Sequence, residues 1–210
     1  MSRAELKSQA KKVLKGKVFT FFLILLVPSL AFSIISAATA GFGAIAVVLV
    51  AGALEYALSV IFLTSLRKNT APKFEDLFLG FKDNNFGRTL EAYVRIIFFT
   101  VLWSLLFFIP GIIKGIAYSQ TFFLMADDKK LTAGEAQKKS IELMNGHKMD
   151  YFILQLSFFP WLLLVGLTLG FALIYVGPYM QLTLTAFYDK IKGGSSSHHD
   201  HTKAEEAILA

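Results

Sequence analysis

Two charged side chains, Glu55 and Lys114, interrupt three long stretches of the chain that otherwise carry no charge: Val18–Leu66, Ile96–Ala126 and Tyr151–Tyr188. A charge near the middle of a bilayer costs about 2.5–3.5 kcal/mol on insertion scales, so such a group is usually protonated, paired or in contact with water. We therefore predict that Glu55 and Lys114 meet as an ion pair within the membrane. Such a pair is either structural or the centre of a proton or substrate site. Alternatively, Lys114 snorkels outward to the membrane surface and forms no pair.

Polar but uncharged side chains accompany this candidate intramembrane site. Gln120 follows Tyr118 by two residues, and Gln181 follows Tyr179 by the same interval. Polar side chains inside membrane helices usually form hydrogen bonds to neighbouring helices, worth about 0.6–2 kcal/mol each. The two glutamines either join helices in this way or line a polar cavity.

Few other residues offer catalytic or metal-binding chemistry. The chain has no cysteine, which excludes disulfides and thiolate chemistry. There is no Ser/His/Asp set and no glycine-rich phosphate loop, so we expect no enzymatic activity and no cofactor. His198, His199 and His201 in the tail could bind a metal ion weakly, but no evident scaffold fixes them, and we predict no dedicated metal site.

The composition indicates how these residues are positioned. Hydrophobic residues make up 55% of the chain and aromatic residues 14%, and about 20 apolar residues cross the hydrocarbon core as a helix. Each uncharged stretch is long enough for two helices and a turn, and we expect the outer turns of the second and third stretches at Pro110-Gly111 and at Gly166–Gly170. We therefore expect an all-α membrane protein whose six transmembrane helices form three hairpins.

The basic residues predict an orientation. The net charge is +6, and of the 21 Lys and Arg residues all except Lys114 lie outside the three apolar stretches. If each stretch is a hairpin, these residues share the cytoplasmic side, as the positive-inside rule requires, and both termini are cytoplasmic. Treating Ile96–Ala126 as one kinked helix would instead place the Lys129–Lys148 loop outside, so we reject it. The charge suits anionic lipid headgroups, whereas no nucleic-acid-binding module accompanies it.

An internal repeat supports three hairpins in the same orientation. Tyr118 and Gln120 precede Asp128 with the spacing that Tyr179 and Gln181 show to Asp189, and Tyr56 begins a weaker first copy. We expect one integral membrane domain over residues 1–192, with repeat units at about 1–68, 70–129 and 130–192. The Gly/Ser-rich residues 193–210 are expected to be a flexible cytoplasmic tail.

Each unit is expected to begin with an amphipathic helix on the inner leaflet. Ser2 with Glu5, and Thr132 with Glu135, have the spacing of capping boxes. In the second unit the spacing of four apolar residues predicts a helical face that could contact lipid or a partner protein. These residues are Phe74, Leu77, Phe78 and Phe81.

A set of short segments along the chain forms a recognisable pattern. They are Trp103, Ile109–Lys114, Leu131–Ala136, Met144–Lys148, Leu156–Phe158, Trp161, Leu167–Gly170 and Pro178–Tyr179. Together these segments resemble one bacterial family of integral membrane proteins, the domain of unknown function nine-seven-five (DUF975), which is common in Gram-positive bacteria. The resemblance covers most of the chain from the first helix to about Tyr188, and the segment Pro110–Lys114 is its most specific part. It implies a multi-pass protein of the cell membrane and assigns no activity, ligand or active residues.

Two functions remain open. The first is a non-catalytic scaffold or accessory protein of the bacterial cell membrane that interacts with lipid, or with a membrane or cytoplasmic partner, at the inner leaflet. The alternative is a small transporter or channel with an intramembrane site at Glu55 and Lys114. The lysine-rich start, the apolar run from Val18 and the residues Ala38-Thr39-Ala40 could also form a cleaved signal peptide, but this apolar run is longer than a usual signal core.

Overall fold

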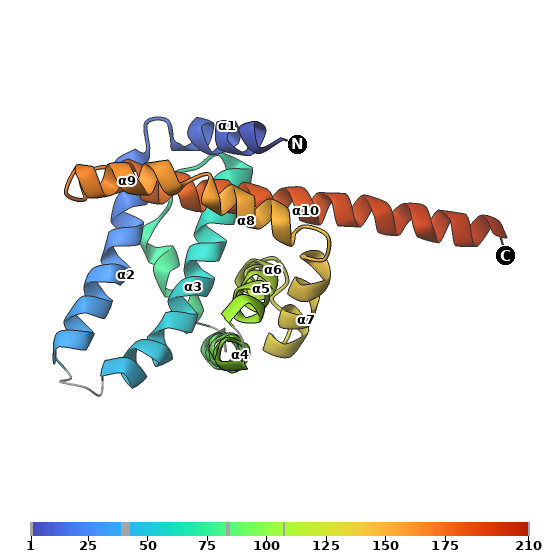
Figure 1. Ribbon diagram of the computed structural model, residues 1–210, viewed down its shortest axis with the longest axis horizontal. Helices are drawn as coiled ribbons and strands as arrows, with labels where there is room; N and C mark the ends of the chain where they lie inside the picture. The colour runs from blue at the N-terminus through green and yellow to red at the C-terminus, as the bar shows by residue number, and fades with distance from the viewer. Residues whose placement is uncertain (1, 39–42, 83–84, 107, 210) are drawn as a thin grey trace.

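A computed structural model describes the backbone of residues 2–38, 43–82, 85–106 and 108–209. Side chains at positions 35, 38, 43–46, 106, 108 and 194–209 are not described. Every regular element within the described ranges is a helix, which confirms the all-α prediction (Figure 1). The elements are α1 (Arg3–Leu14), α2 (Val18–Ala38), α3 (Gly43–Lys68), the 3₁₀ helix η1 (Phe74–Phe81), α4 (Asn85–Leu106), α5 (Phe108–Tyr118), α6 (Thr121–Asp127), α7 (Ala133–Leu143), α8 (Lys148–Leu156), α9 (Phe159–Leu167) and α10 (Leu173–Leu209).

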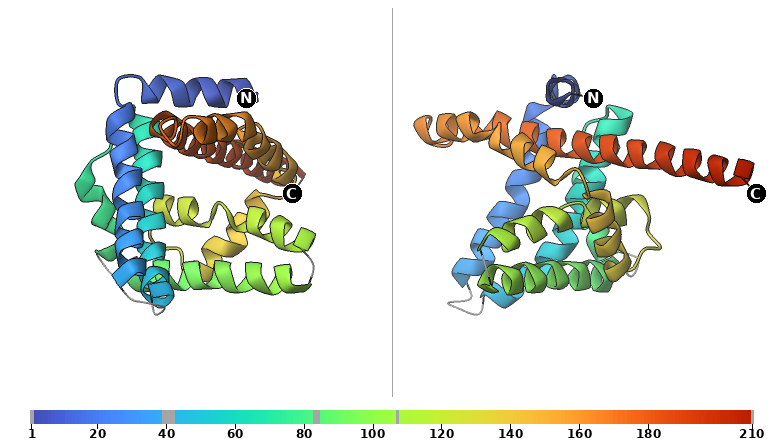
Figure 2. Two further views of the ribbon diagram at one scale, coloured as in Figure 1. Left: turned by 60° about the vertical axis from the view of Figure 1, so that its left-hand side comes forward. Right: turned by 45° about the vertical axis from the view of Figure 1, so that its right-hand side comes forward.

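Three helical hairpins extend from a shared central region. They are formed by α2 with α3, by α4 with α5, and by α8 and α9 with α10. The three hairpins do not run side by side: α2 and α3 run downward in Figure 1, α9 and α10 run across its upper part, and α4 and α5 run to one side in Figure 2. The tertiary structure is therefore splayed and differs from a bundle of six parallel helices.

The expectation of six membrane-spanning helices is wrong by the length and composition of the helices. Among the described residues, Val47–Lys68 and Lys148–Leu167 are long and apolar enough to cross a membrane. A third span results if Arg3–Leu14 and Val18–Ile34 count together, although the two are bent by 94°. The remaining helices are interrupted or charged: the chain breaks between α5 and α6, and the first half of α4 carries Arg88, Glu91 and Arg95.

The amphipathic segments pack against the helices of the hairpins. The helix α1 lies against α10, η1 against α3, and α7 against α6 and α4. Both capping boxes are confirmed, because the Ser2 and Thr132 hydroxyls accept from the backbone N–H groups of Glu5 and Glu135. The apolar face of α1 is buried in the core that also contains Phe187 and Leu182. This face contacts protein, so α1 does not rest on a lipid surface through it.

The face predicted around Phe78 differs from the expected α-helical stripe. Because η1 is a 3₁₀ helix with three residues per turn, Leu77 and Gly80 share its inner side. Leu77 packs with Ile24 and Ile61, whereas Phe74, Phe78 and Phe81 are exposed. Leu77 therefore does not belong to the accessible face.

Prolines and glycines determine where the hairpins turn. The predicted outer turn at Pro110-Gly111 is wrong, since both residues lie within α5, where proline is tolerated in the first turn. The turn predicted at Gly166–Gly170 is confirmed: α9 ends at Leu167, and Leu169 and Gly170 have φ values of 50° and 94°.

Candidate functional site

The two charges that the sequence predicts to pair, Glu55 and Lys114, do not meet in the structure. Glu55 is an exposed residue of α3, and no ion pair joins it to Lys114 among the described residues. The Lys114 ammonium instead lies 4.9 Å from the centroid of the Trp103 ring, a cation–π contact between α5 and α4. The structure thus places Lys114 within its own hairpin and leaves Glu55 on another.

The two glutamines occupy different environments. Gln120 is buried, and its side-chain amide donates to the Ser119 hydroxyl at 2.7 Å, whereas its Oε1 has no described partner. Gln181 is half-buried within the continuous helix α10, and its carbonyl accepts from the Thr185 hydroxyl. Tyr118 and Tyr179 are both buried. The matching spacing in the sequence therefore does not produce matching burial of the two side chains.

The α7 residue Ser140 forms hydrogen bonds with backbone groups that would otherwise be unpaired where the helix is interrupted after α5. Its hydroxyl accepts from the backbone N–H of Gln120 at 3.2 Å and donates to the carbonyl of Ala117 at 2.7 Å. Both groups are buried, and a buried backbone group without a partner costs about 1–3 kcal/mol. Ser140 thus supplies hydrogen bonds that a continuous helix would have made internally.

Charged groups converge where α3 and α6 end beside the continuous helix α10. The Arg67 guanidinium forms ion pairs with Asp127 of α6 and, at 2.5 Å, with Asp189 of α10. Asp127 also accepts hydrogen bonds from the Tyr188 hydroxyl at 2.7 Å and from the Lys192 ammonium at 2.6 Å. We call these five residues the junction. It joins α3, α6 and α10.

The junction keeps Asp127 ionised. Burial of its side chain, which is only 8% exposed, would raise the pKa of this carboxyl. Hydrogen bonds from Arg67, Lys192 and Tyr188 outweigh burial and lower its pKa from 3.8 to about 2. The junction therefore combines two cations with two carboxylates and is electrostatically balanced, as a structural connection requires.

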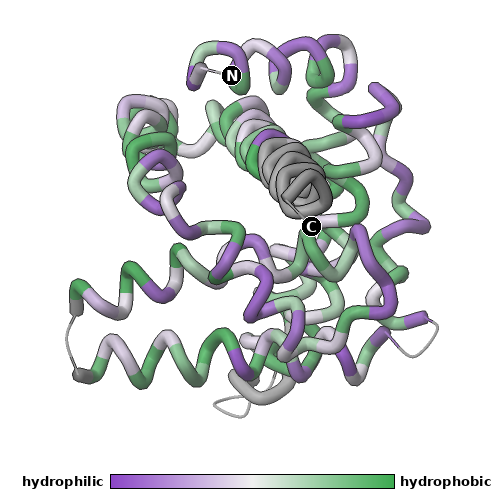
Figure 3. Tube along the Cα trace, turned by 90° about the vertical axis from the view of Figure 1, so that its right-hand side faces the viewer, coloured by the Kyte–Doolittle hydropathy of each residue, from purple (hydrophilic) through white to green (hydrophobic). Residues whose placement is uncertain are grey.

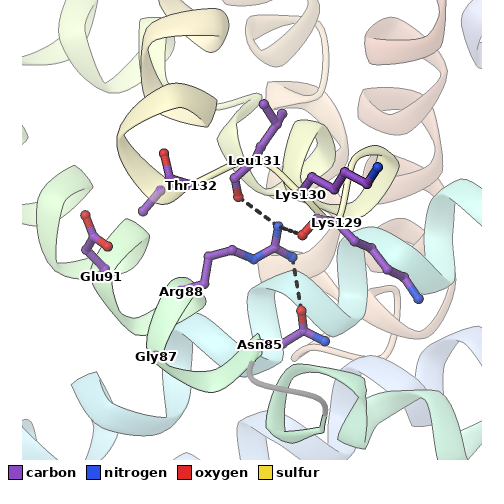
Figure 4. Close-up of a pocket in the computed structure, with 9 residues that line it drawn as sticks. Asn85, Gly87, Arg88, Glu91, Lys129, Lys130, Leu131 and Thr132 are labelled. Carbon is purple, nitrogen blue, oxygen red and sulfur yellow. Dashed lines mark hydrogen bonds between the residues drawn. The ribbon is translucent and has the colours of Figure 1, made fainter.

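Arg88 of α4 forms a second connection, next to a cavity of about 470 Å³ between the start of α4 and the loop before α7 (Figure 4). Its Nη1 donates to the carbonyls of Lys129 and Leu131 at 2.7 and 2.9 Å, and its Nη2 donates to Asn85. The guanidinium also lies 5.5 Å from the centroid of the Tyr56 ring. Because the loop carbonyls occupy its donors, Arg88 mainly holds this loop in place.

Sequence reasoning missed four residues that connect elements of the structure: Arg67, Asp127, Arg88 and Ser140. Asp127 stands beside the repeated Asp128, and Arg67 ends an apolar stretch, so both looked like ordinary cytoplasmic flanking charges. The clearest available signal was the aspartate that follows an apolar stretch directly. The tail histidines His198, His199 and His201 lie outside the residues whose side chains are described.

These observations define a class: an all-helical protein with two to three helices that could cross a membrane by length and composition. The chain belongs to the family described as Protein of unknown function (DUF975), whose family model matches residues 1–113 and 106–195. This confirms the resemblance given by the sequence motifs. No curated protein and no solved structure matches the chain.

Proposed function

We propose that this chain is a multi-pass protein of the bacterial cell membrane and acts as a non-catalytic scaffold, with both termini in the cytoplasm. The main support for membrane insertion is the surface of the hairpins. Their outer ends expose large apolar side chains, including Leu105, Leu167 and Leu169, the last 91% exposed. In water such a surface would drive aggregation. Figure 3 shows hydrophobic positions along the α4 and α5 hairpin.

A single observation carries the scaffold role: α1 is fixed to the protein by its apolar face, which leaves Lys12 and Lys15 exposed. Leu6, Ala10, Val13 and Leu14 are buried, and the ammonium groups of Lys7 and Lys11 lie over the Phe158 and Tyr179 rings. The two outward ammonium groups attract anionic headgroups, at about 1 kcal/mol per basic residue near the surface. We infer that α1 binds anionic lipid through its lysines rather than by inserting its apolar side.

The exposed phenylalanines of η1 are proposed to contact the hydrocarbon of the bilayer. Gly80 of η1 lies directly against the backbone of Ala53, within the apolar helix Val47–Lys68. Phe78, which is 61% exposed, is therefore placed beside a candidate span. If Phe78→Asp leaves insertion intact but abolishes capture of a specific protein, the face binds a partner and not lipid.

Membrane insertion and orientation can be tested without background, because the chain has no cysteine. We expect the protein to resist extraction by alkaline carbonate. Leu169→Cys should react with an impermeant maleimide in intact cells, whereas Lys138→Cys should react only after permeabilisation. Labelling of Lys138→Cys in intact cells would contradict the proposed orientation, and release by carbonate would contradict insertion itself.

The lipid role is tested by charge reversal. Purified protein is analysed for co-purified phosphatidylglycerol and phosphatidylcholine after incubation with an equal mixture of both. Lys12→Glu with Lys15→Glu should lower the retained fraction of phosphatidylglycerol severalfold. The matched control, Lys73→Glu with Lys82→Glu, reverses two exposed lysines that flank η1 and should have a smaller effect. Equal retention in all three proteins would refute a lipid-binding role for α1.

The transporter alternative has less support, because Glu55 and Lys114 do not meet. Lys114 contacts Trp103, and Glu55 is exposed on α3. Flux into liposomes that disappears with Glu55→Gln would overturn the scaffold proposal in favour of this alternative.

A further inference from the structure

A cavity of about 300 Å³ lies between α4, α5 and α8, and its surface is mainly apolar with several hydrogen-bonding groups among the lining side chains. Five of the side chains that line it carry hydrogen-bonding groups, and none of its described lining residues is charged. This volume falls at the lower end of the range for small-molecule sites, which is about 300–1,000 Å³. The polar lining residues are Thr100, Ser104, Ser119, Tyr151 and Gln155.

The Thr100 hydroxyl on α4 differs from several other helix hydroxyls of the protein in its hydrogen bonding. Ser59, Thr183 and Thr185 each donate to a carbonyl of their own helix four residues earlier. The Thr100 hydroxyl is buried and has no partner among the described residues. An unsatisfied buried hydroxyl costs free energy, so a ligand or water that pairs with it would be stabilised.

The opposite wall of the cavity is ordered by its own contacts. Tyr151 of α8 is buried and lines the cavity together with Ser119 and Gln155. The Ser119 hydroxyl donates to the carbonyl of Ile116 at 2.8 Å and accepts from Gln120. The cavity thus presents fixed hydroxyl and amide groups on one side and an open hydroxyl on the other.

Two glycines of α5 create the space. A Cβ at Gly111 would overlap Ser104, so this glycine lets α4 and α5 approach closely. A Cβ at Gly115 would lie 3.7 Å from the Thr100 methyl group, an ordinary contact that would narrow the cavity without a clash. The exposed residue Ile112 lines the cavity as well, which indicates that it opens on the apolar surface of the hairpin.

We propose that this cavity binds an uncharged polyhydroxyl group, such as the sugar head of a neutral lipid that enters from the side of the bilayer. The chemistry follows from the lining: hydroxyl, phenol and amide groups match several hydroxyls, whereas a phosphate would find no cation among the described lining residues. The same chemistry could come from a free sugar. The inference rests on the proposed insertion of the protein into a membrane.

The test uses the full chain in phosphatidylcholine nanodiscs that contain monogalactosyl diacylglycerol, with native mass spectrometry to count the retained lipid. Free galactose is titrated separately, with the unfolding temperature as the readout. Wild type should retain the galactolipid in preference to phosphatidylcholine. Thr100→Val with Ser104→Ala should lower retention on the order of tenfold, as expected from losing two hydrogen bonds.

Matched controls separate binding from folding. Ser29→Ala with Ser33→Ala also removes two helix hydroxyls, both of which bond to their own helix α2, and should leave retention unchanged. Gly115→Ala should reduce retention by filling the cavity while the unfolding temperature stays near wild type. Gly166→Ala, where a Cβ meets nothing within 4 Å, is the control for that substitution.

The outcomes are distinct. Retention of galactolipid that is lost in both cavity variants supports the site and assigns a lipid source. A thermal shift with free galactose that the same variants abolish supports the site and assigns a soluble source. Binding of neither probe, or binding that the cavity variants leave unchanged, overturns the inference. A chain that carbonate releases would instead refute the proposed function.

Discussion

The Arg67 guanidinium and the Asp127 carboxylate form an ion pair that connects the end of α3 to the end of α6, although 60 residues separate them in the chain. Asp189 binds the same guanidinium from α10, so one arginine side chain connects α3, α6 and α10. Since the hairpins diverge from one another (Figures 1 and 2), their relative positions depend on this shared point.

Removing the charge of Asp127 should destabilise the protein measurably. Asp127→Asn leaves Arg67 and Lys192 facing a neutral amide, and we expect the free energy of unfolding to fall by about 2 kcal/mol. Urea unfolding in detergent, followed by circular dichroism, measures this loss. Glu91→Gln is the control, because Glu91 pairs with Arg95 at 3.6 Å on an exposed helix face, and such a pair contributes about 0.3–0.5 kcal/mol. Equal losses in both variants would contradict the role of the junction.

Acid should remove the contribution of Asp127 within a defined pH range. Its pKa is about 2 in the folded protein against an ordinary value of 3.8. A depressed pKa stabilises the folded state above the unfolded value, and this contribution is lost as the pH falls through the folded value. The stability difference between wild type and Asp127→Asn should therefore be constant above about pH 5 and shrink between about pH 4 and pH 2. A difference that does not change down to pH 2 would exclude this carboxylate as the source.

Substitution of Ser140 should destabilise the interruption between α5 and α6, because backbone groups there lose their hydrogen-bond partner. Ser140→Ala removes the partner of both the Gln120 N–H and the Ala117 carbonyl, and we expect a loss of about 1–3 kcal/mol. Hydrogen exchange of the Gln120 amide should become faster. Ser157→Ala serves for comparison, because that hydroxyl bonds only within its own helix, to Leu154. Unchanged protection at Gln120 would show that another group satisfies the break.

The contact between η1 and α3 depends on the absence of a side chain at Gly80. A Cβ there would overlap the backbone of Ala53, so Gly80→Ala should displace η1 and lower the free energy of unfolding by about 1–3 kcal/mol. At Gly87 a Cβ meets nothing within 4 Å, and Gly87→Ala in α4 should be neutral or stabilising by up to about 1 kcal/mol. Thermal unfolding of both variants gives the comparison. Retained stability in Gly80→Ala would mean that η1 is loosely attached.

Local patterns predicted local structure well. The capping boxes at Ser2 and Thr132 and the buried faces of α1 and α7 depend on interactions over three or four residues, which the sequence contains in full. The family assignment likewise followed from short motifs. The turn at Pro110 was misplaced because proline is compatible both with a turn and with the first turn of a helix. The threefold repeat stays a prediction.

What the sequence alone determined is the helical class, the apolar stretches and the separation of basic from apolar segments, because composition and periodicity depend only on neighbouring residues. Only the tertiary structure decided that the hairpins diverge, that Lys114 contacts Trp103 and not Glu55, and that Arg67 meets Asp127 and Asp189. Such contacts depend on how whole helices cross. The residue type of a charged or hydroxyl side chain does not indicate which helix that side chain will contact in the folded protein.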